Sequence, residues 1–388
     1  MFHIASEQDI KDGSVTDVYF QRTVEILRAR NIHKHAVAEV RAAHLPEGWD
    51  WAVLAGIEEV AHLVSGVDAA VATLAEGTVL RPGDPVLVIE GDYVDYGILE
   101  TPLLGLLCQA SGVATKAARC RIAADGRPVI SFGARRMHPA LAPMIDRSAY
   151  LGGCDGVSVI ASARHLGIEP TGTMPHALVL IVGDPVEAFR LFHEVVPASV
   201  SRVCLVDTVH DEKYEAVAAA EALGDALQSV RLDTPGSRRG NIIEIAQEVR
   251  WELDLRGFRH VKILISGGLD EYEVMELNPV ADAYGVGTSI SNAPTINFAM
   301  DIVEVEGKPC AKRGKHSGRK QVVSCLSCHQ RTVVAADHSD RCPSCGGPAQ
   351  PLLTPLSERG TIVRQLPPVD EIRQSVIDQL TGLTLSGV

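Results

Sequence analysis

Short apolar runs that end in small or polar residues recur along the middle of the chain. Seven such runs, each followed by a helix-like stretch, lie at 128–131, 154–159, 177–182, 202–208, 229–233, 261–266 and 283–288. Alternation of strands and helices favours a parallel α/β sheet, either open or closed. Polar residues gather at the carboxyl ends of these runs, where barrel enzymes hold their chemistry. The pattern therefore predicts an α/β fold built on an incomplete (β/α) barrel over residues 119–300, with a doubly wound sheet as the alternative.

The segments on either side of the predicted barrel lack its regular alternation of strands and helices. Residues 1–118 predict an N-terminal α/β domain in which a helix starts after Asp17, 76–92 form a β-hairpin around a Pro-Gly-Asp turn, and 95–118 form a long apolar helix. Residues 301–388 predict a small C-terminal region that starts with a β-rich piece and ends in an amphipathic helix over 369–380. The chain is thus expected to consist of three parts.

Four cysteines of the C-terminal region have the spacing of a metal site. Cys325 and Cys328 form one Cys-x₂-Cys knuckle, and Cys342 and Cys345 form a second one 13 residues further on. Two such knuckles are typical of a structural zinc ribbon, in which four thiolates close a tetrahedral shell. Unligated thiols are the alternative. The spacing predicts a structural Zn²⁺ ion rather than a catalytic one, because a catalytic zinc keeps an open position.

Composition and charge narrow the class of function. The chain has 388 residues and a formal charge of 36 − 49 = −13, which argues against a broad nucleic-acid surface, since phosphate binding needs clustered Lys and Arg. A basic segment at 312–320 is the exception. We expect no membrane span, because no run of about 18 apolar residues occurs. The first residues lack the basic and apolar regions of a signal peptide, so we expect a cytoplasmic protein.

Two neighbouring strand ends carry glycines. Gly267 and Gly268 follow the run 261–266, and Gly287 with Thr288 follows the next run. Glycine lets the backbone approach a ligand closely and turn its N–H groups toward an anion. Two consecutive βα units with this feature predict a phosphate site, which barrels commonly build after their last two strands. Ordinary glycine-rich turns are the alternative.

Charged and aromatic residues stand at the same ends of the other predicted strands. Arg135 and Arg136 lie beside Phe132, a combination that suits a carboxylate or phosphate and a flat ring, or a surface Arg pair and a core Phe. Arg231 and Asp233 alternate on one strand and therefore share a face, where they can hold a phosphoribosyl group or pair with each other.

Further candidates precede or follow these strands. His176 comes directly after Pro175, at the start of the apolar run 177–182, and is either a functional residue or a satisfied structural histidine. Arg238 and Arg239 open the helix after Arg231 and Asp233, where they suit a pyrophosphate or solvent.

Several of these motifs together resemble the nicotinate phosphoribosyltransferases. The zinc ribbon and the Arg-Leu-Asp-Thr-Pro form resemble the archaeal-type branch of that family. The matching motifs occur in the expected order at 16–19, 131–136, 150–155, 172–176, 231–236, 266–269 and 285–288.

The resemblance implies an incomplete barrel of the type II phosphoribosyltransferase kind and a homodimer with shared active sites, or a larger assembly of such dimers. The implied reaction joins nicotinate to phosphoribosyl pyrophosphate, releases pyrophosphate and is driven by ATP, with Mg²⁺ accompanying the phosphates. It serves NAD biosynthesis and salvage. The residue roles that the resemblance implies are pyridine binding by Phe132, Arg135, Asp155 and the Tyr19 side chain of the partner, ribose and diphosphate binding by Arg231 and Asp233, 5′-phosphate binding by Gly267, Gly268, Gly287 and Thr288, and phosphorylation by ATP at His176.

Other functions stay open at this point. Quinolinate or nicotinamide are alternative substrates within the same superfamily, although a dicarboxylate should need a denser Lys/Arg cluster than the sequence offers. Asp155 could accept a hydrogen bond from the amide of nicotinamide. From another class, the chain could be a zinc-ribbon binding protein with a non-catalytic barrel, an idea that only the basic segment 312–320 supports.

Overall fold

The computed structural model describes residues 2–237 and 240–385, which form two compact units. The first unit takes in the chain up to Thr115 together with Pro294–Gly382, and the second takes in Lys116–Ala293 with Leu383–Leu385. The division into three parts at 118/119 and 300/301 stays a prediction about independently folding domains.

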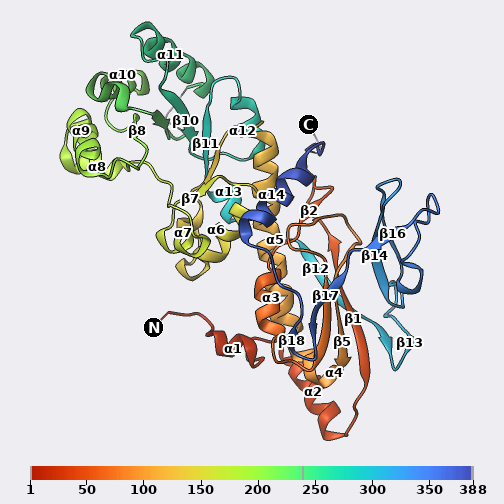
Figure 1. Cartoon of the computed structure of the whole chain (residues 1–388). Helices are drawn as coiled ribbons and strands as arrows, with labels where there is room; N and C mark the ends of the chain where they lie inside the picture. The colour runs from red at the N-terminus through yellow and green to blue at the C-terminus, as the bar shows by residue number, and fades with distance from the viewer. Residues whose placement is uncertain (1, 238–239, 386–388) are drawn as a thin grey trace. The chain divides into compact units, whose positions relative to one another are not determined.

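An antiparallel sheet forms the centre of the first unit (Figure 1). Its seven strands are, in spatial order, β13 (Lys308–Pro309), β12 (Asn297–Val305), β1 (His35–His44), β5 (Pro85–Asp92), β3 (Ala69–Thr73), β17 (Thr354–Glu358) and β18 (Thr361–Ile362). The helices of this unit include α1 (Glu7–Lys11), α2 (Val18–Ala29), α3 (Ile57–Val64), α4 (Tyr93–Tyr96), the first part of α5 (Glu100–Ala123) and α14 (Val369–Leu380). The helix predicted over 369–380 is therefore confirmed.

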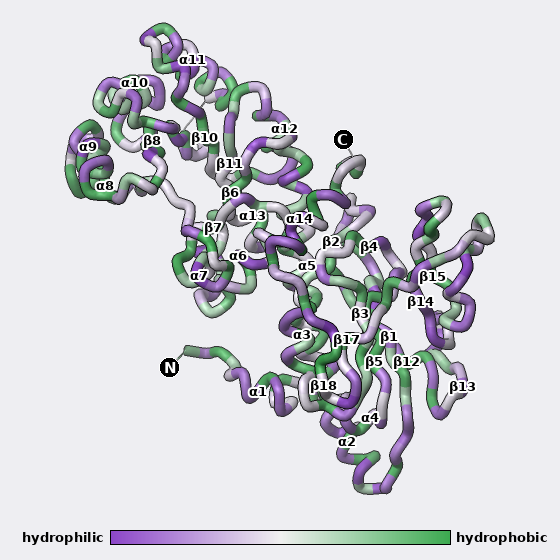
Figure 2. Tube along the Cα trace, viewed as in Figure 1, coloured by the Kyte–Doolittle hydropathy of each residue, from purple (hydrophilic) through white to green (hydrophobic). Residues whose placement is uncertain are grey.

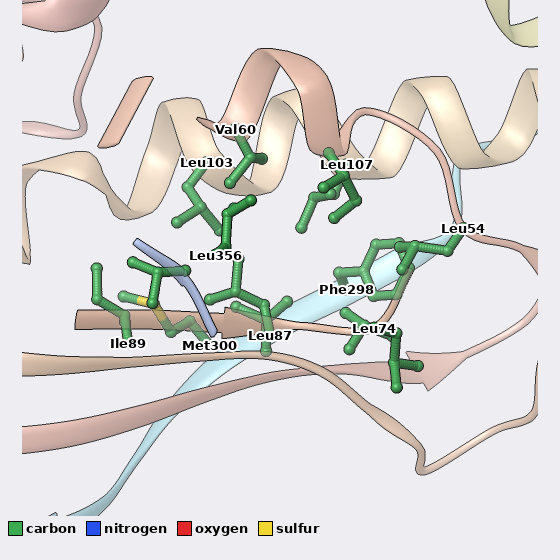
Figure 3. Close-up of a cluster of buried hydrophobic side chains, with 14 of the residues drawn as sticks. Leu54, Val60, Leu74, Leu87, Ile89, Leu103, Leu107, Phe298, Met300 and Leu356 are labelled. Carbon is green, nitrogen blue, oxygen red and sulfur yellow. The ribbon is translucent and has the colours of Figure 1, made fainter. Parts of the chain in front are cut away.

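Apolar side chains from sheet and helices meet in one core. Leu103 and Leu107 of α5 and Val60 of α3 pack over Leu87 of β5 and Phe298 of β12 (Figure 3). Strand β12 comes from the far end of the chain, so burial of its apolar face joins the two segments of this unit. The stretch Tyr93–Ala123 is long and apolar enough to span a membrane by length and composition alone. However, 56% of its most apolar window is buried inside the protein, as in a core helix.

The predicted hairpin over 76–92 is wrong. Strand β4 (Val79–Leu80) pairs with β2 (Ala52–Val53) in a separate two-stranded sheet, while β5 pairs with β1 on one side and β3 on the other. Both edges of β5 are occupied, so β4 has no edge of β5 to pair with.

A six-stranded parallel sheet forms the second unit. Strands and helices follow one another along this unit, and both hydrophobic and hydrophilic residues occur along its helices (Figure 2). The strands are β6 (Val129–Ser131), β7 (Gly156–Val157), β8 (Val203–Leu205), β9 (Ser229–Leu232), β10 (Lys262–Ser266) and β11 (Ala283–Val286). The helices are α6 (Ala142–Leu151), α7 (Ile160–Leu166), α8 (His176–Val182), α9 (Pro185–Val195), α10 (Glu212–Leu223), α11 (Ile242–Leu255), α12 (Glu271–Leu277) and α13 (Thr288–Ser291).

The strand order shows that this sheet is a barrel with one opening. In space the strands run β7-β6-β11-β10-β9-β8, so the first strand, β6, pairs with the last, β11. That pairing closes the sheet upon itself, and the two ends of the sheet are β7 and β8. The predicted incomplete barrel is confirmed, and the segment 158–202 connects its two open edges.

The run 177–182 is a helix and not the strand that its apolar residues predicted. Pro175 precedes α8 in an extended conformation, and Gly183 ends it in the left-handed region, at φ +88°. Only Val179 is fully buried, whereas Leu180 and Ile181 are 64% and 84% exposed. The barrel therefore has six strands instead of about seven, because a run of six apolar residues fits a short helix as well as a strand.

Candidate active site

Polar side chains from the carboxyl ends of β9 and β10 form one hydrogen-bonded group. Arg231 of β9 reaches Asp233 just beyond the strand end, with Nη2 3.0 Å from Oδ1. Arg231 Nε donates to Ser266 Oγ at 2.8 Å, and Ser266 Oγ lies 2.6 Å from Asp233 Oδ1. The two residues share a face, as the sequence predicted, and parallel pairing of β9 with β10 brings Ser266 beside them.

His176 lies between two carboxylates of this group. Its Nε2 is 3.5 Å from Asp233 Oδ2, and its Nδ1 is 3.2 Å from Thr208 Oγ1 and 3.9 Å from Asp207 Oδ1. The imidazole is 41% exposed, so it stays accessible to a ligand. Since α8 starts at His176, the segment across the barrel opening brings this side chain to the strand ends.

Asp207 is the buried carboxylate of the cluster. Its side chain is 2% exposed, and among the described residues Oδ1 has no hydrogen-bond partner, while Oδ2 accepts from Thr234 Oγ1 at 3.1 Å. Burial raises the pKa of Asp207, and the neighbouring His176 opposes that rise. Sequence analysis passed over Asp207 as a site residue, although it ends an apolar strand in the way that the other candidates do.

The Ser-Gly-Gly corner has the backbone geometry that the sequence predicted. Gly267 and Gly268 both adopt left-handed φ values, +96° and +79°, which side chains rarely tolerate. A Cβ on Gly267 would lie 3.1 Å from the Asp233 carbonyl oxygen, whereas a Cβ on Gly268 would meet no atom within 4 Å. Gly268 therefore faces open space beside Asp233.

The second glycine corner lies next to the first. Gly287 precedes α13, which starts at Thr288, and Ser289 Oγ donates to the carbonyl of Leu269 at 2.7 Å. This bond ties the two corners together, as expected from the parallel pairing of Ser266 with Gly285. Backbone N–H groups at such corners can bind an anion.

Phe132 covers the strand ends from the β6 side. Its ring lies against Gly285, where an added Cβ would come within 2.4 Å of the ring. The guanidinium carbon of Arg231 lies 5.3 Å from the centroid of the same ring, a cation–π distance. Arg135 is exposed in the turn Ala134–Arg136 that follows Phe132, whereas Ala134 is buried.

The structure does not bring Asp155 to this group. Asp155 accepts hydrogen bonds from the Val129 N–H at 2.9 Å and from Arg121 Nη1 at 2.8 Å. Because Val129 is the first residue of β6, Asp155 lies at the amino ends of the strands, away from the glycine corners. A cavity of about 700 Å³ also opens at the amino ends, lined by Arg127 and Asp282 among others, and contains none of the candidate residues.

Three other candidates, Tyr19, Arg238 and Arg239, are not assigned to this group. Tyr19 belongs to the first unit, where it is 57% exposed on α2 and its hydroxyl lies 3.3 Å from Asp17 Oδ2. Arg238 and Arg239 lie outside the described residues.

The four predicted metal ligands lie together at the ends of a three-stranded sheet, β15 (Arg331–Ala335), β14 (Lys320–Cys325) and β16 (Ala349–Pro351). The sulfur atoms of Cys325, Cys328, Cys342 and Cys345 lie within 4.8 Å of one another. A tetrahedral zinc site with Zn–S bonds of about 2.3 Å needs sulfurs about 3.8 Å apart, so this cluster could bind a metal such as zinc. Backbone N–H groups of Cys328 and Ser327 point at Cys325 Sγ and lower the pKa of that thiol to about 6, which favours the thiolate ligand.

Two family models match parts of the chain between residues 17 and 301. Residues 17–111 match the N-terminal domain of quinolinate phosphoribosyl transferase, and residues 113–301 match its C-terminal domain.

Similar proteins carry related names. A nicotinate phosphoribosyltransferase of Mycobacterium tuberculosis is 33% identical over 326 residues, which cover 79% of this chain and 67% of that protein. The crystal structure of a nicotinate-nucleotide pyrophosphorylase from Pyrococcus furiosus is 55% identical, covers 98% of both chains and superposes with a TM-score of 0.95. The structure of human nicotinic acid phosphoribosyltransferase shares the fold, with a TM-score of 0.78 over 95% of this chain and 94% of the human one, at 21% identity.

Proposed function

This chain belongs to the nicotinate phosphoribosyltransferase family, and we infer that it transfers a phosphoribosyl group to nicotinate in NAD biosynthesis. One observation carries the inference to the site: Arg231, Asp233 and His176 lie together, one strand away from a left-handed glycine corner that faces open space. Such an arrangement suits a sugar that bears a phosphate at one end and a diphosphate at the other.

The chemistry needs positioned charge rather than a protein nucleophile. The lone pair of the pyridine nitrogen attacks C1 of the ribose, the C1–N bond forms, and the C1–O bond to pyrophosphate breaks. No proton has to be removed from the pyridine nitrogen. Positive charge develops on the sugar and negative charge on the leaving group, so catalysis depends on orientation and electrostatic stabilisation.

Each group of the cluster suits one part of this substrate. The amides around Gly267, Gly268, Gly287 and Thr288 would bind the 5′-phosphate. Asp233 would accept from the ribose hydroxyls, and Arg231 would stabilise the departing diphosphate. In the proposal, nicotinate stacks on Phe132, and its carboxylate pairs with the exposed Arg135. We assign Asp155 a structural role instead, because it binds Val129 and Arg121 at the other end of the strands.

The position of His176 supports coupling to ATP. In our proposal, Thr208 Oγ1 accepts from Nδ1–H, and Nε2 attacks the γ-phosphorus of ATP. A P–N bond forms, the P–O bond to ADP breaks, and water later cleaves the P–N bond to release phosphate. Asp233 would thereby link phosphorylation of His176 to the diphosphate site, since it lies 3.5 Å from Nε2.

Replacement of the histidine tests the coupling. His176→Ala should bind nicotinate as the wild type does and lose the stimulation of turnover by ATP, because no nitrogen is left to accept the phosphoryl group. His165→Ala, in α7, provides a control for loss of an exposed histidine in the same unit. Full ATP stimulation in the His176 variant, measured as mononucleotide formed per minute with and without ATP, would refute the role.

The names of the relatives leave one alternative substrate to test. Quinolinate, named by the matching family models, carries a second carboxylate that needs another cation. Arg231 already pairs with Asp233. The cations that remain for a second carboxylate, and that lie nearest to Phe132 in sequence, are Arg135 and Arg136. Turnover of nicotinate, quinolinate and nicotinamide, measured side by side with phosphoribosyl pyrophosphate, Mg²⁺ and ATP, should favour nicotinate. If the protein turns over quinolinate, measured as release of CO₂, faster than it turns over nicotinate, its function is that of a quinolinate phosphoribosyltransferase.

Metal ions have two separate roles in this proposal. Zn²⁺ bound by the four cysteines would stabilise the fold of the three-stranded sheet in the first unit. Mg²⁺ would accompany the diphosphate and ATP and neutralise their charge. Asp207 is suited to hold it, because its buried Oδ1 has no hydrogen-bond partner among the described residues.

We further propose a cytoplasmic homodimer whose active sites combine the barrel of one chain with Tyr19 of the partner. An exposed tyrosine on α2 is available for such a contact. Dilution of the protein should lower both its mass in light scattering and its specific activity. A fully active monomer would contradict the shared site.

The non-catalytic, zinc-ribbon class of function is disfavoured by the partners of the basic segment. Lys312 and Lys315 both pair with Asp301, while Arg319 bonds to Glu304. Lys320 likewise pairs with a buried glutamate of β1. Because internal carboxylates neutralise most of this positive charge, little is left for an oligonucleotide.

A further inference from the structure

Ser266 occupies a place in the cluster that the reaction itself does not explain. We propose that Ser266 is a positioning residue, which orients Arg231 toward the diphosphate and joins that contact to the phosphate-binding corner. The proposal rests on the proposed function.

Ser266 closes a ring of two hydrogen bonds and one ion pair. Its hydroxyl accepts from Arg231 Nε at 2.8 Å and donates to Asp233 Oδ1 at 2.6 Å, while Arg231 Nη2 contacts the same oxygen at 3.0 Å. The serine is 2% exposed, so it acts on these two side chains and not on a ligand. A hydroxyl suits this place because it accepts from a cation and donates to an anion at once.

The ring decides which N–H groups of Arg231 are left for a substrate. A guanidinium has five N–H donors. Ser266 accepts from Nε–H, and Thr173 Oγ1 accepts from one N–H of Nη1 at 2.8 Å, while Nη2 forms an ion pair with Asp233 Oδ1 at 3.0 Å. With respect to these two hydrogen bonds, one N–H of Nη1 and both N–H groups of Nη2 remain. These charged donors are available for the oxygens of a phosphate group.

The remaining contacts of Arg231 support a fixed orientation. Thr173 accepts from Nη1, a different nitrogen from the one that Ser266 binds, and the guanidinium carbon lies over the Phe132 ring at 5.3 Å from its centroid. The side chain is 14% exposed. A guanidinium that donates from Nε and Nη1 and stacks on a ring cannot turn without breaking a charge-assisted hydrogen bond. Its orientation is therefore set before the substrate arrives.

The place of Ser266 in the chain couples the two ends of the substrate. It is the last residue of β10 and directly precedes Gly267, whose Cα lies close enough to Asp233 that an added Cβ would come within 3.3 Å of Oδ1. One short segment thus presents its side chain to the diphosphate and ribose residues and its following amides to the proposed 5′-phosphate. A shift of the corner would move both contacts together.

Removal of the hydroxyls tests the proposal. Ser266→Ala and Thr173→Val should each lower kcat roughly 10- to 100-fold, the effect of one lost hydrogen bond to a charged group. They should weaken binding of Mg²⁺-pyrophosphate in calorimetry and leave the KM for nicotinate unchanged. Thr173→Ser keeps the hydroxyl and should restore wild-type kcat. Ser148→Ala removes a buried hydroxyl of α6 whose contact is with the Met144 sulfur at 3.9 Å, and it should be as active as the wild type.

A double-mutant cycle separates positioning from a general loss of structure. In an Arg231→Lys background, where the Nε–H donor to Ser266 is gone, Ser266→Ala should cost far less than in the wild type. Additive losses, or wild-type kcat in both Ser266→Ala and Thr173→Val, would overturn the proposal. If the wild type itself forms no mononucleotide from any of the three pyridines, the proposed function fails. Undiminished binding of Mg²⁺-pyrophosphate by Ser266→Ala would then count separately against positioning.

Discussion

The glycine corner can be tested by one methyl group. Gly268 adopts φ +79°, and a Cβ placed there meets no protein atom within 4 Å. Gly268→Ala therefore adds strain to the backbone but no clash with the protein. The new methyl group projects into the open space that the 5′-phosphate occupies in our proposal.

The expected cost to stability follows from the backbone alone. A left-handed conformation costs a residue with a Cβ about 1–2 kcal/mol. In a unit the size of Lys116–Ala293, each kcal/mol lowers Tm by about 2–4 °C. The expected cost to activity is larger, because displacement of a substrate by about 1 Å can reduce the rate about 100-fold.

A matched glycine separates the two effects. Gly167 ends α7 with φ +70°, lies in the same unit, and also has no atom within 4 Å of an added Cβ. Gly167→Ala should lower Tm as much as Gly268→Ala does, while its kcat/KM for phosphoribosyl pyrophosphate stays that of the wild type.

Steady-state kinetics and thermal unfolding of both variants decide the matter. The reasoning predicts equal losses of Tm and a loss of kcat/KM in Gly268→Ala only. Equal kcat/KM values for the two variants would refute the phosphate site at this corner, whatever their stabilities.

Three further changes test other parts of the molecule. Glu271→Ala should destabilise the second unit by about 3–5 kcal/mol, because the fully buried Arg119 loses the carboxylate that lies 2.8 Å from its Nε. Urea unfolding of this variant and of the exposed control Glu276→Ala measures the loss. Equal stabilities of the two variants would contradict the prediction. Burial raises the pKa of Glu100 to about 7, so the folded protein keeps a proton that the unfolded chain loses, and stability falls as pH rises from about 4.5 to about 7. Glu100→Gln should remove this part of the fall in Tm, and parallel Tm–pH curves for variant and wild type would argue against it. Cys342→Ser should abolish binding of one zinc ion per chain, measured by metal analysis after dialysis, and full retention of zinc would exclude the cysteine cluster as the site.

Local patterns in the sequence were sufficient for the features that depend on neighbouring residues. Two Cys-x₂-Cys knuckles predict a metal cluster because the tight turn of each knuckle already directs both sulfurs to one point. The left-handed corner at Gly267 and Gly268 follows from residue type, since glycine tolerates that conformation without strain. The helix over 369–380 follows from the periodicity of its apolar residues.

The tertiary structure decided everything that depends on which edges and ends meet. Pairing of β6 with β11 closes the barrel, and the run 177–182 becomes a helix across the opening between β7 and β8. Asp155 resembled a site residue in sequence, but it precedes β7 and so lies at the wrong end of the strands.

The same dependence explains why Ser266 and Asp207 escaped notice. Ser266 lies 35 positions after its partner Arg231, and Asp207 lies 31 positions after its neighbour His176. Periodicity describes how each segment folds and which face it buries. Which side chains then share a hydrogen bond is set by strand order and register, and these are properties of the whole sheet.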